Sequence, residues 1–223
     1  MNTDTKVNDS QRINTSDKIR KSQLVAIIRL ANQDEVEAVV TCLIKGGVTA
    51  LEITSNTPGF AQEIKHARAK HPEVLIGAGT IIDSKLAKEA IKAGAQFLVT
   101  PNTNKSVVKA AHKHGIPVLM GALTPTDIAN CIKFKADFIK VFPAGSLGIK
   151  YFKDLQGPYS DIPLMPVGGV NIDNIEEWFE AGAIGVGVGN DLTQAANTVN
   201  EQEALINIVK SYVAKLPSKN NDT

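Results

Sequence analysis

Two charged residues stand inside apolar runs of this sequence, where a purely structural core would not place them. Lys140 lies in the run Phe138-Ile139-Lys140-Val141, and Glu52 lies in Ala50-Leu51-Glu52-Ile53-Thr54. A lysine among apolar residues loses solvation, which disfavours the ammonium form and leaves more neutral amine. A neutral amine is the nucleophile that forms a Schiff base with a carbonyl compound. A carboxylate in the same pocket could move protons during that reaction. We therefore predict Lys140 as nucleophile and Glu52 as acid/base group.

The same two residues also have a purely structural interpretation. Lys140 and Glu52 could form a buried ion pair that takes no part in any reaction. Such a pair costs desolvation and is a poor way to stabilise a core. The sequence therefore favours chemistry at this pair, with the ion pair as the alternative.

Further polar and glycine residues stand at the ends of other apolar runs. They are Arg29, Thr80 after Gly77-Ala78-Gly79, Pro101 in Thr100-Pro101-Asn102, Gly168-Gly169, and Gly189-Asn190. Arg29 and Thr80 could hold a carboxylate, although Arg29 could equally extend from a rim into solvent. Backbone N–H groups of Gly168-Gly169 and Gly189-Asn190 could bind a phosphate, or these glycines could serve turn geometry alone.

The histidines give no sign of a metal or cofactor site. His66, His71, His112 and His114 fall in expected helices or at their ends, without metal-ligand spacing. The run Gly185–Gly189 resembles a dinucleotide loop only superficially, because the acidic residue expected further on is missing and the run closes a last strand. We expect no metal and no cofactor.

The elements that position these residues follow from a repeated helix-to-strand joint. Gly47, Gly94, Gly115 and Gly182 each end a helix-like segment just before a short apolar run. Gly94 and Gly115 are 21 residues apart, which matches one unit of about 22 residues, and the two longer separations match two and three units. Counted in this way, the chain holds eight strand–helix units.

The expected strands are short, rich in Val, Ile and Leu, and apolar on both faces, as strands covered by helices must be. They span Leu24–Arg29, Ala50–Thr54, Val74–Ala78, Gln96–Thr100, Pro117–Met120, Asp137–Val141, Leu164–Val167 and Ile184–Val188. Amphipathic helices run between them, for example over Asp34–Lys45. An open doubly wound sheet shares this alternation, but eight units favour an α/β fold of a single (β/α)8 TIM barrel. The candidate residues then gather at the carboxyl ends of the strands, where this fold places its active sites.

The domain organisation follows from length and composition. The 223 residues suit one barrel domain, which we assign to residues 18–223. Residues 1–17 hold almost nothing apolar and are expected to form a disordered arm.

Charge and composition limit the partners. Lys and Arg number 24 against 23 Asp and Glu, so neither a basic excess nor a basic run suggests nucleic acid or an anionic membrane. The sequence has no run of about 20 apolar residues, and because its first twenty positions are polar, without an apolar h-region, we expect no signal peptide. Cys42 and Cys131 have no pairing or metal pattern, which suits a reducing cytoplasm. We expect a cytoplasmic protein.

Over about residues 20 to 215 the sequence resembles the 2-keto-3-deoxy-6-phosphogluconate (KDPG) and 4-hydroxy-2-oxoglutarate (KHG) aldolase family. The motifs that carry the resemblance are Leu51-Glu52-Ile53-Thr54, Gly77-Ala78-Gly79-Thr80, Phe138-Ile139-Lys140-Val141-Phe142-Pro143-Ala144 and Pro166-Val167-Gly168-Gly169-Val170. The resemblance implies that Lys140 is the Schiff-base lysine, Glu52 the acid/base and Thr80 a carboxylate ligand. It also implies that the glycine loops bind phosphate.

The resemblance further implies a homotrimer without metal that cleaves a keto-acid phosphosugar to pyruvate and D-glyceraldehyde 3-phosphate. Cleavage of 4-hydroxy-2-oxoglutarate to pyruvate and glyoxylate is the alternative main activity. Two positions depart from the gluconate-type pattern: Asn56 stands where many members carry arginine, and Asn190 where serine is frequent. The runs from Glu52 to Pro58 and from Val99 to Asn102 look closer to the 6-phosphogalactonate (KDPGal) branch, in which Arg29 would bind an anion.

Two other functions compete with an aldolase. A phosphosugar isomerase or epimerase barrel would share the glycine loops but would need no buried lysine. A non-catalytic binding protein descended from an aldolase would have no reason to keep a costly buried Lys140 beside Glu52.

Overall fold

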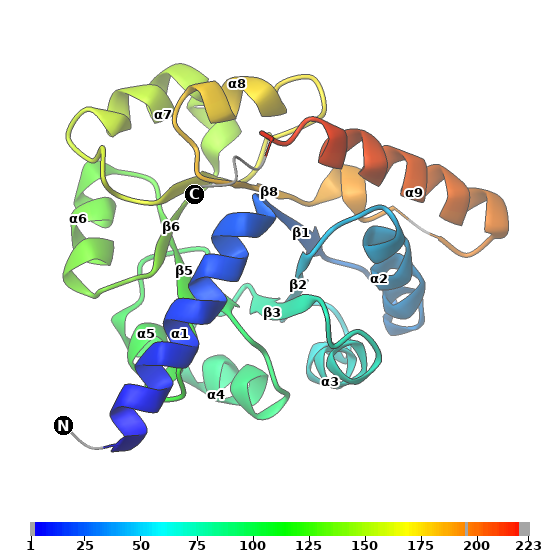
Figure 1. Cartoon of the computed structure of the whole chain (residues 1–223), viewed down its shortest axis with the longest axis horizontal. Coiled ribbons are helices and arrows are strands. Elements are labelled where there is room, and N and C mark those ends of the chain that lie inside the picture. Colours follow the sequence, from blue (N-terminus) through cyan, green and yellow to red (C-terminus); the bar gives the residue numbers. More distant parts are fainter. Residues whose placement is uncertain (1–2, 195, 219–223) are drawn as a thin grey trace.

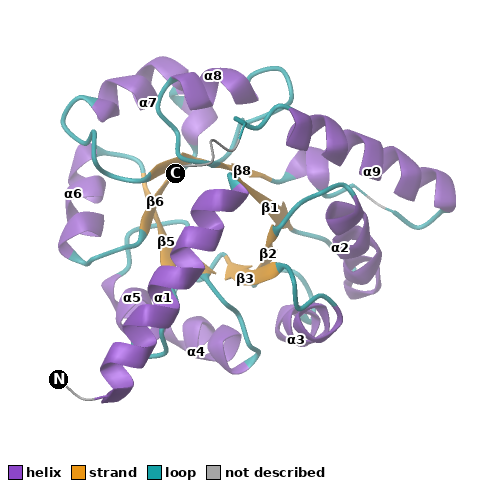
Figure 2. Ribbon diagram, viewed as in Figure 1, coloured by secondary structure: helices purple, strands orange, loops and turns teal. Residues whose placement is uncertain are grey.

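The computed structural model describes residues 3–194 and 196–218, in which eight parallel strands form one barrel. The strands are β1 (Leu24–Ile28), β2 (Ala50–Thr54), β3 (Leu75–Gly79), β4 (Leu98–Val99), β5 (Val118–Ala122), β6 (Phe138–Val141), β7 (Leu164–Pro166) and β8 (Val186–Val188). Their order is β7-β6-β5-β4-β3-β2-β1-β8, and a bridge between Val167 and Gly187 joins the two ends. Figure 2 shows the strands inside the surrounding helices. The prediction of a single (β/α)8 barrel is confirmed.

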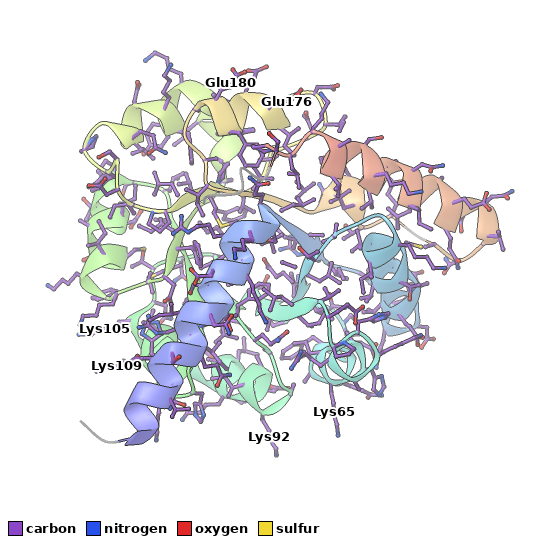
Figure 3. The ribbon with its side chains drawn as sticks, viewed as in Figure 1. Lys65, Lys92, Lys105, Lys109, Glu176 and Glu180 are labelled. Atoms are coloured by element: carbon purple, nitrogen blue, oxygen red, sulfur yellow. The ribbon has the colours of Figure 1, made fainter. Side chains whose placement is uncertain are left out.

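Helices surround this ring of strands (Figure 1). They are α1 (Thr3–Ser22), α2 (Val36–Lys45), α3 (Phe60–Lys70), α4 (Ser84–Lys92), α5 (Lys105–His112), α6 (Pro125–Lys133), α7 (Gly148–Gln156), α8 (Ile175–Glu180) and α9 (Val199–Ala214), with short 3-10 turns η1 (Gln33–Glu35), η2 (Ala144–Ser146) and η3 (Asn190–Leu192). Side-chain caps fix several starts; Thr124 and Thr198, for example, each form a capping box with the acidic residue three positions later. Lysines and glutamates labelled in Figure 3 lie on the outer sides of these helices, so the charge is concentrated away from the barrel.

The amino-terminal segment differs from the expected disordered arm. Residues Thr3–Ser22 form α1, which crosses the end of the barrel at which the strands begin (Figure 1). Arg12 on α1 donates to Asp137 at 2.6 Å, and Asn8 donates to the Lys113 carbonyl at 2.9 Å. Tertiary contacts thus hold a segment that has little apolar surface of its own. Residues 3–17, for which the sequence predicted a disordered arm, are thus helical in this structure, and residues 1 and 2 lie outside the described residues.

Packed apolar side chains fill the part of the barrel interior near the amino ends of the strands, and we call this cluster the apolar plug. Fully or nearly fully buried side chains from the strands meet there and are joined by Ile19 from α1; the set is Ile19, Val25, Ala50, Leu75, Phe97, Val99, Leu119, Phe138 and Met165. Because side chains alternate along a strand, the next inward position above Ala50 is Glu52, and the next above Phe138 is Lys140. The polar pair therefore lies above the plug, toward the carboxyl ends of the strands.

No helix among the described residues is both long and apolar enough to cross a bilayer. Within the same residues, no group of three or more His, Cys, Asp and Glu side chains could hold a metal ion.

Candidate active site

Lys140 and Glu52 are both buried inside the barrel. Lys140 is 5% exposed and Glu52 is 2% exposed. The Lys140 Nζ lies 4.9 Å from the centre of the Phe142 ring, and the Oε1 atom of Glu52 is buried without a hydrogen-bond partner among the described residues. A buried carboxylate oxygen without a partner is costly unless it can receive a proton or meet a ligand.

Burial shifts both groups toward their neutral forms. It lowers the pKa of the Lys140 amine below its ordinary value; the Glu52 charge opposes this change and the Arg29 charge adds to it. Burial also raises the pKa of the Glu52 carboxyl, against the charges of Lys140 and Arg29. The lysine is thus prepared to act as a neutral nucleophile, and the carboxyl to carry and release a proton.

Glycines on neighbouring strands make room for these long side chains. A side-chain carbon at Gly79 on β3 would overlap the Glu52 carboxyl group and force it to move. Gly121 on β5 is paired with Lys140 on β6, and a side chain there would overlap the backbone at Pro101. The glycines at these strand ends therefore leave the space that the side chains of Glu52 and Lys140 occupy.

A cavity of about 340 Å³ opens at the carboxyl ends of the strands. Six of the ten residues expected at a site line it: Arg29, Lys140, Gly168, Gly169, Gly189 and Asn190. These residues contribute a guanidinium group after β1, an amine in β6, and glycine loops after β7 and β8. It is large enough for a small phosphorylated keto acid.

The loop after β7 has the backbone geometry that its glycines permit. Gly168 and Gly169 both adopt φ of +83°, a region that side chains rarely enter. Gly145 N donates to the Gly168 carbonyl at 2.7 Å, and a side chain at Gly169 would lie only 2.7 Å from the Gly145 Cα. The two chain segments pass so closely that glycine is required on both sides.

Arg29 and Thr80 lie beside each other at the mouth of the barrel. The Arg29 Nη2 atom is 3.5 Å from the Thr80 Oγ1 atom. Thr80 has φ of +56°, which is a strained value for a β-branched residue, and Ser55 Oγ donates to its carbonyl at 2.8 Å. Strain of this kind persists where the surroundings impose it, and it often accompanies a binding role.

Four expected site residues do not line the cavity: Glu52, Asn56, Thr80 and Pro101. Glu52 is buried and coupled in charge to Lys140, and Thr80 reaches the site through Arg29. Pro101 packs its backbone on Gly121. Asn56 is exposed on the loop after β2.

The structure also adds lining residues that the sequence reasoning missed. They are Ile27, Phe142, Val167, Val170, Asn171 and Asp191. Phe142, Val167 and Val170 stood inside the quoted motifs, and Asp191 directly follows Asn190, so position next to a strand end was the available indication. The side-chain hydroxyl of Tyr212, which reaches Asp191 from a helix that begins 8 residues after it, could not be found in this way.

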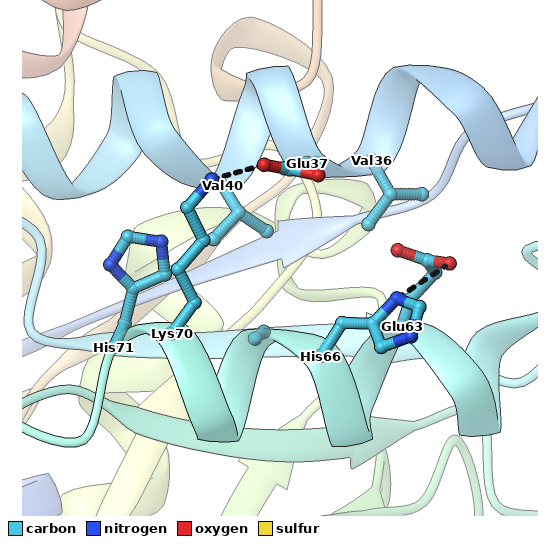
Figure 4. A pocket seen from close by; sticks show the side chains of 8 residues that line it. Val36, Glu37, Val40, Glu63, His66, Lys70 and His71 are labelled. Atoms are coloured by element: carbon cyan, nitrogen blue, oxygen red, sulfur yellow. Dashed lines mark hydrogen bonds and ion pairs between the residues drawn. The ribbon is translucent and has the colours of Figure 1, made fainter.

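A smaller cavity, of about 30 Å³, lies between α2 and α3 and is shown in Figure 4. Glu37 pairs with Lys70 there, and His66 approaches Glu63 at 3.8 Å. Its volume suits one or two waters. It lies between two outer helices, and none of its lining residues belongs to the strand-end cavity.

Comparisons with known proteins agree with this geometry. The model of the KDPG and KHG aldolase family matches residues 15–209. The 2-dehydro-3-deoxy-6-phosphogalactonate aldolase of Escherichia coli (strain K12) is 35% identical over 196 residues, which cover 86% of this chain and 95% of that relative. The 2-dehydro-3-deoxy-phosphogluconate aldolase of Haemophilus influenzae is 34% identical over 163 residues, 73% of this chain and 77% of that relative.

Solved structures show the same similarity. A structure described as native KDPGal is 33% identical, has a TM-score of 0.79, and is matched over 86% of this chain and 93% of its own. The KDPG aldolase of Legionella pneumophila, solved with pyruvate as a covalent carbinolamine intermediate, has a TM-score of 0.81 over 88% of this chain and 97% of its own. At 24% identity, that second likeness supports the fold alone.

Proposed function

Because this chain belongs to the KDPG and KHG aldolase family, we propose that it is a Schiff-base aldolase. Its substrate is a 2-keto-3-deoxy-6-phospho sugar acid, which it cleaves reversibly to pyruvate and D-glyceraldehyde 3-phosphate. One observation carries the proposal: Lys140 is a buried lysine with a lowered pKa that lines the cavity at the strand ends.

The chemistry follows from the pair inside the barrel. The neutral Lys140 amine adds to the C2 carbonyl of the substrate, and the resulting carbinolamine loses water to give a protonated imine. The C4 hydroxyl then gives up its proton, the C3–C4 bond breaks, and its electrons pass to the imine to form an enamine. The aldehyde leaves, C3 takes a proton, and water releases pyruvate and regenerates Lys140. Glu52 has the raised pKa that suits it to exchange the protons of these steps through a water.

The two ends of the substrate are anionic, and the cavity offers donors for both. Gly168-Gly169 and Gly189-Asn190 present backbone to the phosphate end. Arg29 with Thr80 supplies a cation and a hydroxyl for an anionic group of the substrate. The site therefore binds the substrate at both ends, with the reacting carbons near Lys140.

The sugar type is a finer part of the proposal. The 6-phosphogalactonate aldolase relative matches 86% of this chain, and Arg29 lines the cavity while Asn56 does not. These observations support a galactonate-type substrate over a gluconate-type one. Cleavage of 4-hydroxy-2-oxoglutarate to pyruvate and glyoxylate stays the alternative, since it needs the same lysine but no phosphate site.

Assembly and location complete the proposal. Homologous structures include oligomeric assemblies, and we include a homotrimer, which sedimentation equilibrium would test. A cytoplasmic location is also included, because the chemistry is that of a metabolic enzyme and Cys42 and Cys131 are free thiols.

Borohydride trapping with pyruvate tests the central step. We expect an adduct that mass spectrometry maps to Lys140, and none in Lys140→Ala. Lys92→Ala, which removes an exposed lysine of α4, should trap at the wild-type rate. Assayed with each C4 epimer of the phosphosugar acid, the wild type and Lys92→Ala should release pyruvate, and Lys140→Ala should not. An adduct on another residue would exclude the proposed role of Lys140, and activity lost with a chelator and restored by a divalent ion would indicate metal-dependent aldol chemistry instead.

A further inference from the structure

We propose that Tyr212 and Asp191 are a positioning pair that holds the loop after β8 in the shape that binds the phosphoryl group of the substrate. The proposal rests on the proposed function, since it names which groups fix the phosphate end of that same site. Neither residue belongs to the groups assigned above to bind or react.

Asp191 stands between the active-site cavity and a second cavity. It lines the first together with Asn190 and Asn171. It also lines the second, of about 280 Å³, whose other walls are Ile172, Gln194, Ile208, Ser211 and Tyr212. Asp191 is the lining residue that these two cavities share.

Tyr212 reaches this wall from α9. Its side chain is 1% exposed, and its hydroxyl donates to the Asp191 Oδ2 atom. Burial, followed by the bond to Asp191, raises the pKa of the Tyr212 phenol, so that it stays protonated and acts as a donor. A hydrogen bond to a charged acceptor is stronger than one between neutral groups.

Two other hydrogen bonds of the loop after β8 join residues of the loop to one another. Leu192 N donates to the Gly189 carbonyl at 2.9 Å, and Thr193 Oγ1 donates to the same carbonyl at 3.0 Å. These bonds close the turn on itself, whereas the Tyr212 bond connects it to α9. That helix is packed closely on α2, because a side-chain carbon at Gly46 would overlap Val209. The Tyr212 bond thus ties the loop to a helix that is itself packed on α2.

The hydrogen bond also fixes where the negative charge of Asp191 lies relative to the phosphate site. A free carboxylate beside an anion site repels phosphate. Because the Asp191 carboxylate is bonded to a neutral hydroxyl from α9, its position is set by α9 and not by the ligand. Loss of the hydroxyl would free both the loop and the charge.

Four variants separate the bond from the charge. Tyr212→Phe deletes the donor, Asp191→Ala deletes the acceptor, and Asp191→Asn keeps an acceptor oxygen but removes the charge. Tyr159→Phe is the matched control, because its hydroxyl donates to the Pro125 carbonyl far along the chain from the loop.

Each variant is assayed with the phosphorylated substrate, with its unphosphorylated counterpart, and with inorganic phosphate as a competing ligand. For Tyr212→Phe and Asp191→Ala we expect KM for the phosphorylated substrate and the inhibition constant of phosphate to rise about tenfold. The value of kcat should change less than about twofold, and kcat/KM for the unphosphorylated substrate should stay unchanged. The double variant should be no worse than either single one. Asp191→Asn and Tyr159→Phe should keep wild-type KM.

The results can overturn the proposal in three ways. Equal losses on both substrates would indicate general destabilisation, which thermal melting of each variant would detect. Unchanged phosphate affinity in Tyr212→Phe would exclude a positioning role. A rise in KM for Asp191→Asn as large as for Asp191→Ala would mean that an acceptor oxygen at this position does not hold the loop, which contradicts the positioning role of the bond from Tyr212. Pyruvate trapping on Lys140 is measured in parallel. If the wild type gives no adduct, the proposed function is contradicted. The effect of each variant on the inhibition constant of phosphate can still be interpreted in that case.

Discussion

The Glu52 carboxyl lies in surroundings that disfavour its charge, while Lys140 and Arg29 favour it. Glu52→Gln keeps the shape and removes the proton carrier. We expect kcat to fall about 10²–10⁴-fold with KM nearly unchanged, because the lost interaction belongs to proton transfer. Steady-state kinetics on the phosphosugar acid measure both values. Glu63→Gln, at a buried glutamate outside the cavity, serves as control. A normal kcat in Glu52→Gln would remove Glu52 from the mechanism.

In Glu52→Gln we also expect the pH dependence of the trapping rate to shift. Trapping requires the neutral amine, so its rate rises with pH and reaches a plateau above the Lys140 pKa, which is lowered from 10.5. The Glu52 charge raises that pKa, so Glu52→Gln should lower it further. The midpoint of the trapping rate, measured with pyruvate and borohydride, should therefore move to lower pH. A midpoint that moves to higher pH would contradict the coupling.

The sugar preference can be tested at Asn56, on the loop expected to help select the C4 epimer. It is exposed on the loop after β2, outside the cavity wall, whereas an arginine there has a longer and forked donor. Because a polar group left unpaired by the wrong epimer costs about 1–3 kcal/mol, Asn56→Arg should change the ratio of kcat/KM for the two C4 epimers roughly tenfold. Asn56→Ala measures what the native side chain contributes. If both variants keep the wild-type ratio, this position does not select the sugar.

At the scale of elements, α1 depends on a few contacts with the barrel. Arg12 donates to Asp137, whose other oxygen receives bonds from the Val118 N–H at 2.8 Å and meets His112 at 2.8 Å. Arg12→Ala removes a bond to a buried charge, worth about 2 kcal/mol. In a protein of this size that lowers Tm by roughly 4–8 °C.

Calorimetry would measure the change, with Lys18→Ala, an exposed position of the same helix, as control. Because α1 lies at the end of the barrel opposite the cavity, kcat/KM should not change in Arg12→Ala. An unchanged Tm would mean that the Arg12–Asp137 contact does not hold the helix.

Element boundaries show where sequence patterns were sufficient. The β2 strand runs from Ala50 to Thr54 as predicted, because its apolar run ends where the loop begins. The β4 strand is shorter than the predicted Gln96–Thr100: the Gln96 side chain accepts the bond from Ile76 N that a backbone carbonyl would otherwise receive, and the Thr100 hydroxyl accepts one from Gly121 N. No local sequence pattern indicates that a side chain will accept a hydrogen bond in place of a backbone carbonyl at a strand end. The helix α1 was missed for a related reason, since its stability comes from partners more than 100 residues away.

At the scale of the whole molecule, the barrel and the positions of Lys140 and Glu52 could be predicted because both depend on alternation within single strands. The glycine loops could be placed by the same reasoning, since they follow β7 and β8. Asp191 and Tyr212 could not, because their contact joins a loop to the last helix and depends on how α9 packs. Patterns within one element predict what it presents to the core, but contacts between elements require the fold.

The seam between β7 and β8 has a consequence for how the molecule responds to its ligand. Among the described residues these strands meet through the Val167–Gly187 bridge and a bond of 3.1 Å from Ile184 N to the Leu164 carbonyl, whereas β2 and β3 are paired along their full length. Both glycine loops extend from this seam, so a phosphoryl group held by both would connect its two sides. Ligand that binds only the closed barrel stabilises it in proportion to its occupancy. The amide hydrogens of Ile184 and Gly187, the residues that meet β7, should therefore exchange faster than those of β2 in the free protein and slow when inorganic phosphate is added. If they do not slow, the two loops do not share the ligand; if they do, the substrate completes the closure of the barrel that encloses it.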